Sequence, residues 1–193
     1  MTKAIYAGTF DPLTNGHVDI VTRSLKFCDQ LVIAIGINPN KNTMFSDEER
    51  QIFIRQTFAH FANIKVASFQ GLLVDYAKEI GAHVLVRGIR SVSDFEYEIN
   101  LANINKVLAP QIESVFLPTS PELAVVSSSM VKEIAKYGGD ISRFVPQHIG
   151  KAVNDKFGFI KTGNNCQYPD CPESAIGGKL KLTMCKVHQP YPA

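Results

Sequence analysis

The sequence predicts an α/β fold built on a doubly wound sheet of five parallel strands. Short, mostly apolar runs rich in β-branched residues recur along the 193-residue chain, and longer amphipathic stretches separate them. Such runs are typical of parallel strands that helices cover on both faces, and the strand–helix alternation favours right-handed crossovers within one sheet. The expected strands lie at residues 4–7, 31–35, 64–68, 84–87 and 114–117.

Helical spacing and helix-end signals fill the intervals between these strands. Two sets of apolar residues repeat at helical spacing, which are Val18, Val21 and Leu25, and then Ile54, Phe58 and Phe61. Ser46 and Glu49 form the pattern of a capping box that opens the second helix. Further helices are expected at residues 73–80, closed by Gly81, from Ser91 or Ser93 to about 108, from serines 127–129 to about 138, and from Pro146 to about 157.

The composition argues against several classes of function. The formal net charge is +2 and the pI is about 8.3, and no run of Lys and Arg is long enough for a nucleic-acid-binding surface. The apolar stretches, such as residues 31–37, are too short to cross a bilayer, and the first residues lack the apolar region of a secretory signal. We therefore expect a cytoplasmic protein with one main domain, no nucleic-acid partner and no membrane association.

Residues able to bind phosphate are concentrated directly after the expected strands. The segment 8–17, Gly-Thr-Phe-Asp-Pro-Leu-Thr-Asn-Gly-His, follows the first strand, and Lys41 follows the second. Arg87 and Arg90 stand at the end of the fourth strand, and serines 127–129 come after the fifth. Ligands of open parallel sheets bind at the carboxyl ends of the strands, so these cations, hydroxyls and the imidazole predict a phosphate site at one edge.

The segment 8–17 carries the strongest signal. Gly8 lets the chain leave the strand tightly, and Asn15-Gly16 is expected to turn into the first helix. His17 then falls in the first helical turn, where free N–H groups favour phosphate and the imidazole can donate to a phosphoryl oxygen in a transition state. The plain alternative is that His17 only caps the helix. Neither G-x-G-x-x-G after the first strand nor G-x-x-x-x-G-K-[ST] is present, which argues against a dinucleotide oxidoreductase and a P-loop kinase.

Residues 1 to about 158 resemble the bacterial phosphopantetheine adenylyltransferase family. The resemblance rests on Tyr-Ala-Gly-Thr-Phe-Asp-Pro at 6–12, Asn-Gly-His at 15–17, Lys41, Arg-Gly-Ile-Arg at 87–90, Asp-Phe-Glu-Tyr-Glu at 94–98 and the serines at 127–129. It implies a Rossmann-like nucleotidyltransferase domain at residues 1–158, followed by an extension at 159–193. It also implies Mg²⁺ with ATP, a homohexamer, and coenzyme A as a feedback ligand.

The resemblance further implies transfer of AMP from ATP to 4′-phosphopantetheine, which gives dephospho-coenzyme A and pyrophosphate. His17 is the expected transition-state stabiliser, and Lys41 is the second catalytic residue. The residues expected to bind ATP are Thr9, Phe10, His17, Gly88, Ile89, Arg90, Glu98, Leu123, Ala124, Val125, Val126, Ser127, Ser128 and Ser129. The residues expected to bind phosphopantetheine are Thr9, Lys41, Leu73 and Arg87.

Physical chemistry agrees with these assignments, and each also has a plain structural alternative. Lys41 can draw two phosphates together as a mobile point charge, or it can be an exposed turn residue. Arg87 can grip a phosphate through two parallel donors, or it and Arg90 can pair with Asp94 or Glu98. The serines suit a triphosphate at a helix start, or they cap a helix. Leu73 by itself is typical of the core.

The expected reaction is direct in-line attack of the 4′-phosphate on the α-phosphorus, with no covalent intermediate and no general base. The segment 123–126 reads Leu-Ala-Val-Val where the family usually carries aromatics. Adenine selection is therefore expected to use backbone groups. Two other functions stay open, which are a nicotinate-mononucleotide-type adenylyltransferase and a catalytically silent nucleotide-binding module.

The extension at 159–193 contains a candidate metal site. Cys166, Cys171, Cys185 and His188 could supply a closed tetrahedral set of ligands for structural zinc, with Gly177-Gly178 turning a small hairpin between the pairs. The Cys-x₄-Cys spacing is not the commonest, and an unliganded tail is the alternative. No catalytic role is expected for it.

Overall fold

The computed structural model describes residues 1–158; the proposed zinc ligands and the extension at 159–193 lie outside them. The expected strands are all confirmed, and each extends slightly beyond its predicted limits. They are β1 (Lys3–Gly8), β2 (Gln30–Gly36), β3 (Ile64–Phe69), β4 (Val84–Ile89) and β5 (Glu113–Pro118).

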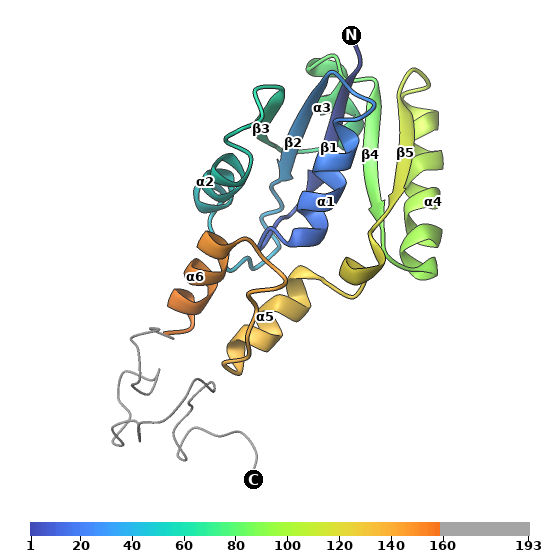
Figure 1. Ribbon diagram of the computed structural model, residues 1–193. Helices are drawn as coiled ribbons and strands as arrows, with labels where there is room; N and C mark the ends of the chain where they lie inside the picture. The colour runs from blue at the N-terminus through green and yellow to red at the C-terminus, as the bar shows by residue number, and fades with distance from the viewer. Residues whose placement is uncertain (159–193) are drawn as a thin grey trace, which may run out of the picture.

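The five strands form one parallel sheet in the order β3-β2-β1-β4-β5, as Figure 1 shows. The central strand β1 pairs Ala4 with Leu31 of β2 on one side and with Val84 of β4 on the other. The chain therefore winds outward from β1 in both directions, and the strand order reverses between β1 and β4. Ligands of doubly wound sheets bind at such a switch point.

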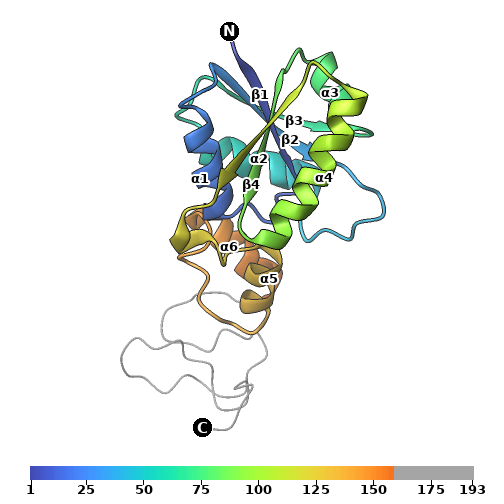
Figure 2. The same cartoon turned by 90° about the vertical axis from the view of Figure 1, so that its right-hand side faces the viewer.

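Alternate residues of each strand supply two separate hydrophobic cores. On β2, Leu31, Ile33 and Ile35 pack into one cluster with α1 (Asn15–Ser24) and α2 (Asp47–Thr57). Val32 and Ala34 face the other cluster with α3 (Leu73–Glu79). Figure 2 shows α1 on one side of the sheet and α3 and α4 (Val92–Leu108) on the other, and α2 shares the core cluster of α1. Burial on both faces explains why the strands read as nearly continuous apolar runs.

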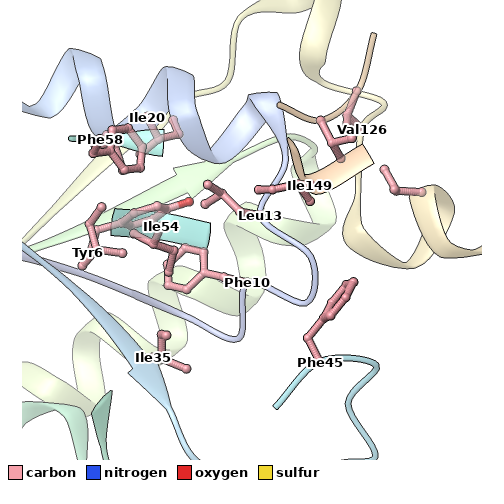
Figure 3. Packing of buried hydrophobic residues seen from close by; sticks show 14 of the residues in the cluster. Tyr6, Phe10, Leu13, Ile20, Ile35, Phe45, Ile54, Phe58, Val126 and Ile149 are labelled. Atoms are coloured by element: carbon pink, nitrogen blue, oxygen red, sulfur yellow. The ribbon is translucent and has the colours of Figure 1, made fainter. Parts of the chain in front are cut away.

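The remaining helices, α5 (Ser128–Lys136) and α6 (Gln147–Lys156), extend the first core beyond the carboxyl ends of the strands. Figure 3 shows Leu13 of the loop after β1 near Ile149 of α6, and both side chains are fully buried. A short 3₁₀ turn at Pro121–Leu123 leads from β5 towards α5. Helices α5 and α6 and the 3₁₀ turn thus lie next to the edge of the sheet where the phosphate site is expected.

Helix ends follow their sequence signals with two corrections. The capping box at Ser46 and Glu49 is confirmed, and Ser91 caps α4. Asn15 and Gly16 are the first residues of α1 rather than a turn before it, because the Thr14 side chain takes the cap. Phe61 lies beyond α2, which ends at Thr57, and its ring packs edge-on against Phe58. In the described part of the chain, no helix is long and apolar enough to span a membrane.

Candidate active site

A cavity of about 320 Å³ opens at the carboxyl ends of β1 and β4, where the strand order reverses. Its volume is at the lower end of the range for small-molecule sites, which is about 300–1,000 Å³. The predicted site residues that line it are Thr9, Phe10, His17, Arg87, Gly88, Arg90, Glu98, Val126, Ser127, Ser128 and Ser129. The structure thus brings together residues that are up to 120 positions apart in the sequence.

Gly8 and Phe10 shape the first wall of the cavity. Phe10 has a φ of 49°, a left-handed conformation that is uncommon for a side chain of its size. Its ring turns back over β1, and a Cβ atom at Gly8 would lie only 3.0 Å from it. The ring is buried and meets His17 edge-on at a centroid distance of 5.1 Å. Phe10 therefore supports the imidazole with its side chain, and the residue has little surface exposed to a ligand.

His17 is held by a capping box at the start of α1. Its backbone N–H donates to the Thr14 hydroxyl, and Nδ1 accepts from the backbone N–H of Thr14 at 2.9 Å. Because Nδ1 is an acceptor, the proton of the neutral ring is on Nε2. Burial, with the nearby Arg90 guanidinium, lowers the pKa of His17 to about 4. His17 is thus both a cap and a neutral hydrogen-bond donor for the cavity.

Arg87 lies at the end of β4 and is fixed by Glu98 of α4. Its Nε and Nη2 donate to the two carboxylate oxygens at 2.6 and 2.5 Å, and Nη1 donates to the Ala7 carbonyl at 3.4 Å. The structural alternative for this arginine is therefore correct in part, because the fork is paired inside the protein. Both side chains still line the cavity, so the pair presents an oriented cation to it.

Arg90 is paired in the same way with Asp94, in the first turn of α4. Its Nε donates to Asp94 at 2.9 Å, and its backbone N–H donates to the same carboxylate at 3.3 Å. The Asp-Phe-Glu-Tyr-Glu stretch thus supplies one carboxylate for each arginine of Arg-Gly-Ile-Arg. Between the arginines, Gly88 allows close packing, since a Cβ there would meet Ile20 of α1 at 3.1 Å.

The serine cluster opens α5, and two of its hydroxyls are already engaged. The Ser127 hydroxyl accepts from the backbone N–H of Met130, and the Ser128 hydroxyl donates to the Pro12 carbonyl at 2.8 Å. The helix-cap alternative therefore applies to Ser127, and Ser128 ties α5 to the loop after β1. The N-terminus of α5 still faces the cavity, where free amides favour anions.

The other predicted site residues do not line this cavity. Lys41 is exposed, with Nζ 3.4 Å from the Thr9 hydroxyl, so it lies beside a residue of the cavity wall. Leu73 begins α3 and packs against the second core cluster. Val125 is 67% exposed. The remaining residues outside the lining are Ile89, Leu123 and Ala124.

Seven lining residues were not among the predicted site residues: Tyr6, Ala7, Thr14, Gly16, Ile20, Asp94 and Thr119. Ala7 and Thr119 lie at or just after the ends of β1 and β5, so the strand-end rule could have found them. Tyr6 and Ile20 read as ordinary core residues. Burial raises the pKa of the Tyr6 hydroxyl, which keeps it protonated beside Gly88.

The chain is similar to known proteins over most of its length. A family described as cytidylyltransferase-like matches residues 5–134. The phosphopantetheine adenylyltransferase of Alkaliphilus oremlandii (strain OhILAs) is 48% identical over 157 residues, which cover 81% of this chain and all of that protein. The enzyme of the same name from Alkaliphilus metalliredigens (strain QYMF) is 47% identical over 156 residues, or 81% of this chain and 99% of that one. The chain belongs to the phosphopantetheine adenylyltransferase family.

The fold of this phosphopantetheine adenylyltransferase family member also occurs in a more distant protein. A solved structure of a Vibrio parahaemolyticus protein, provisionally named a nicotinate-nucleotide adenylyltransferase, aligns with a TM-score of 0.63. The alignment covers 81% of this chain and 95% of that one at 18% identity, so it supports the nucleotidyltransferase fold alone.

Proposed function

We propose that this chain transfers the adenylyl group of ATP to 4′-phosphopantetheine and releases pyrophosphate. The observation that carries the proposal is the shared cavity in which the His17 imidazole, two oriented arginines and the N-terminus of α5 meet. Every one of these groups is a donor or a cation, as a site for two anionic substrates requires. The family relationship supplies the identity of the acceptor.

The residues support direct transfer. The acceptor phosphate is already an anion, so it can attack the α-phosphorus of ATP without a general base, and pyrophosphate leaves on the opposite side. The Nε2–H of neutral His17 donates to the α-phosphoryl oxygens as their charge grows. Arg87 and Lys41 hold the acceptor phosphate beside Thr9, so that the two repelling anions stay at reacting distance.

Magnesium arrives with ATP in this proposal. The two carboxylates that line the cavity, Asp94 and Glu98, are each engaged by an arginine. The oxygen ligands for Mg²⁺ therefore come chiefly from the phosphates and water, as is usual for this ion. Bound there, the ion would neutralise charge on the departing pyrophosphate.

Backbone groups support adenine selection in the segment 123–126. Val126 is buried and lines the cavity, and its N–H donates to the Leu123 carbonyl in the turn before α5. This turn holds Val126 at the cavity without an aromatic ring. We expect the adenine base to contact peptide groups here. Selectivity for adenine over other bases then depends on the backbone geometry of this segment.

A pyrophosphate-release assay tests the function directly. We expect turnover with ATP and 4′-phosphopantetheine and background rates when nicotinate mononucleotide replaces the acceptor. Turnover only with nicotinate mononucleotide would assign the chain to the other acceptor, and ATP binding without turnover on either would make it a nucleotide-binding module.

Self-association into a hexamer is part of the proposal. Helix α4 buries none of its residues, although it carries several exposed apolar side chains, which are Val92, Phe95, Tyr97, Ile104 and Val107. Exposed apolar side chains in this number suit contact with a second copy of the chain. Light scattering is expected to give the mass of six 21.3 kDa chains, and Val107→Glu is expected to lower it. Coenzyme A, which contains the product, is the proposed feedback ligand.

The division at residue 158 and the zinc site also stay proposals. Cys166, Cys171, Cys185 and His188 have the ligand types of a structural zinc centre. Metal analysis of the purified protein is expected to give about one zinc per chain, and Cys185→Ser is expected to lose it. Equal zinc content in both proteins would remove this site.

A further inference from the structure

Asp11 is a buried carboxylate that the proposed reaction does not use. It is 4% exposed, and both of its oxygens accept hydrogen bonds from outside its own loop. Oδ1 accepts from the backbone N–H of Phe45 at 3.0 Å, and Oδ2 accepts from that of Met44 at 3.0 Å. Oδ2 also accepts from Lys132 Nζ of α5 at 2.7 Å. A carboxylate is buried only when it is satisfied in this way.

A buried arginine also connects the loop after β1 to the segment that contains residues 44–45 and the start of α2. Arg50 of α2 is 5% exposed, and its Nη1 donates to the Thr9 carbonyl at 2.8 Å. Its Nε donates to the Ser46 carbonyl at 3.2 Å. The loop after β1 therefore gives a carboxylate to residues 44–45 and receives a guanidinium from the helix that follows them. We name Asp11, Arg50 and Lys132 the clasp.

The clasp lies beside groups that the reaction needs. Met44, which donates to Asp11, follows Lys41 by three residues, and Lys41 itself comes within 3.4 Å of the Thr9 hydroxyl. Lys132 is on α5, whose N-terminus lines the cavity. The chain from 38 to 43 forms neither helix nor strand, so the bonds at residues 44 and 45 are its nearest fixed point on that side.

We infer that Asp11 is a positioning residue, which anchors the Lys41 loop so that the lysine meets the acceptor phosphate beside Thr9. The inference rests on the proposed adenylyl transfer and adds a residue to it. Asp11 is paired on both oxygens and is not among the residues that line the cavity, so it acts through Lys41 and not on the substrates. Asp11→Asn replaces one carboxylate oxygen with an NH₂ group. That group is itself a donor and cannot accept from the donors that now bind the oxygen, so the Lys41 loop loses part of its anchor.

A double-mutant cycle separates this role from a merely structural one. In the full chain, Asp11→Asn is expected to lower kcat about 10-fold to 50-fold and to raise KM for phosphopantetheine more than KM for ATP, since displaced positioning groups cost on this scale. If Asp11 acts through Lys41, the same substitution in a Lys41→Ala background changes kcat by less than about threefold. An undiminished effect in that background, or wild-type kcat in Asp11→Asn, overturns the inference.

Matched variants control for lost stability. Val153→Ala removes two methyl groups from a fully buried side chain of α6 in the first core cluster, and it changes no residue of the clasp. It is expected to lower Tm as Asp11→Asn does while leaving kcat and both KM values near wild type. Lys132→Arg keeps the cation and is expected to retain more activity than Lys132→Met. An equal loss of activity in Val153→Ala, Lys132→Arg and Lys132→Met would indicate general destabilisation and overturn the inference.

Hydrogen exchange supplies a readout that does not depend on activity. Asp11→Asn is expected to speed exchange at the amides of Met44 and Phe45 at least about tenfold, because each loses a charged acceptor. Unchanged protection at both amides would contradict the anchoring. Absence of turnover in the wild-type chain would defeat the proposed function instead, and it would leave this structural readout to decide on the anchor.

Discussion

Replacing His17 by alanine tests the central group of the site. Nδ1 is engaged by Thr14, and a pKa of about 4 leaves the ring neutral, with roughly one molecule in a thousand protonated at pH 7. The ring then contributes one preorganised N–H, from Nε2, to the charge that develops on the α-phosphate. Loss of one such donor costs about 2.7–4 kcal/mol, which is a decrease in kcat of roughly 10² to 10³.

The same substitution has a separate and smaller structural cost. It removes the Thr14 N–H to Nδ1 bond of the capping box and the edge-on contact with Phe10. Loss of a cap typically costs about 1 kcal/mol, or roughly 2–4 °C in Tm for a chain of this size. The variant therefore remains folded at 25 °C, and its decrease in kcat reports on chemistry.

Pyrophosphate release at 25 °C gives kcat, and calorimetric titration gives the Kd of ATP. We expect the Kd to change only a few-fold, since Thr9 and the N-terminus of α5 still face the phosphates. Thr14→Ser keeps the hydroxyl and the backbone donor, and it serves as the matched control with nearly unchanged kcat. A His17→Ala variant within about threefold of wild-type kcat refutes the donor role. A rise in the Kd of ATP by the same factor as the decrease in kcat would also refute the donor role of His17.

Three further predictions follow from named contacts. Because the folded pKa of His17 is below its unfolded value of 6.5, the stability associated with the neutral ring is complete above pH 6.5 and decreases towards pH 4. Urea unfolding is expected to show about 2–3 kcal/mol more loss from pH 7 to 4.5 in wild type than in His17→Ala. Arg87→Lys keeps the charge but loses the fork on Glu98, so acceptor KM rises about tenfold in steady-state kinetics while ATP Kd changes less. Gly8→Ala brings a methyl group within 3.0 Å of the Phe10 ring and is expected to lower thermal stability by about 1–3 kcal/mol; an unchanged Tm would contradict that packing.

The strands and the edge that carries the site could be predicted because both depend on local pattern. Buried parallel strands are continuously apolar, and the chain after each strand must lie at the same edge of the sheet. Helix starts were predicted where a capping side chain is adjacent in sequence, as at Ser46 and Ser91. The start of α1 was placed after a turn at Asn15-Gly16, whereas both residues are helical because Thr14 supplies the cap.

The pairing of charges could not be derived uniquely from sequence. The segment 94–98 contains three acidic residues, and which of them pairs with Arg87 or Arg90 depends on how α4 packs on β4. The structure pairs Arg87 with Glu98 and Arg90 with Asp94. The role of Asp11 was also not evident, because its partners Met44, Phe45 and Lys132 are 33, 34 and 121 positions away.

The sequence by itself determined the alternation of strands and helices and the set of groups that can bind phosphate, since both follow from side-chain type and short-range spacing. Only the tertiary structure decided which of those groups share one cavity and which nitrogen of His17 is free to donate. It also decided which carboxylate holds each arginine. These properties depend on distances between residues far apart in the chain, and packing alone sets those distances.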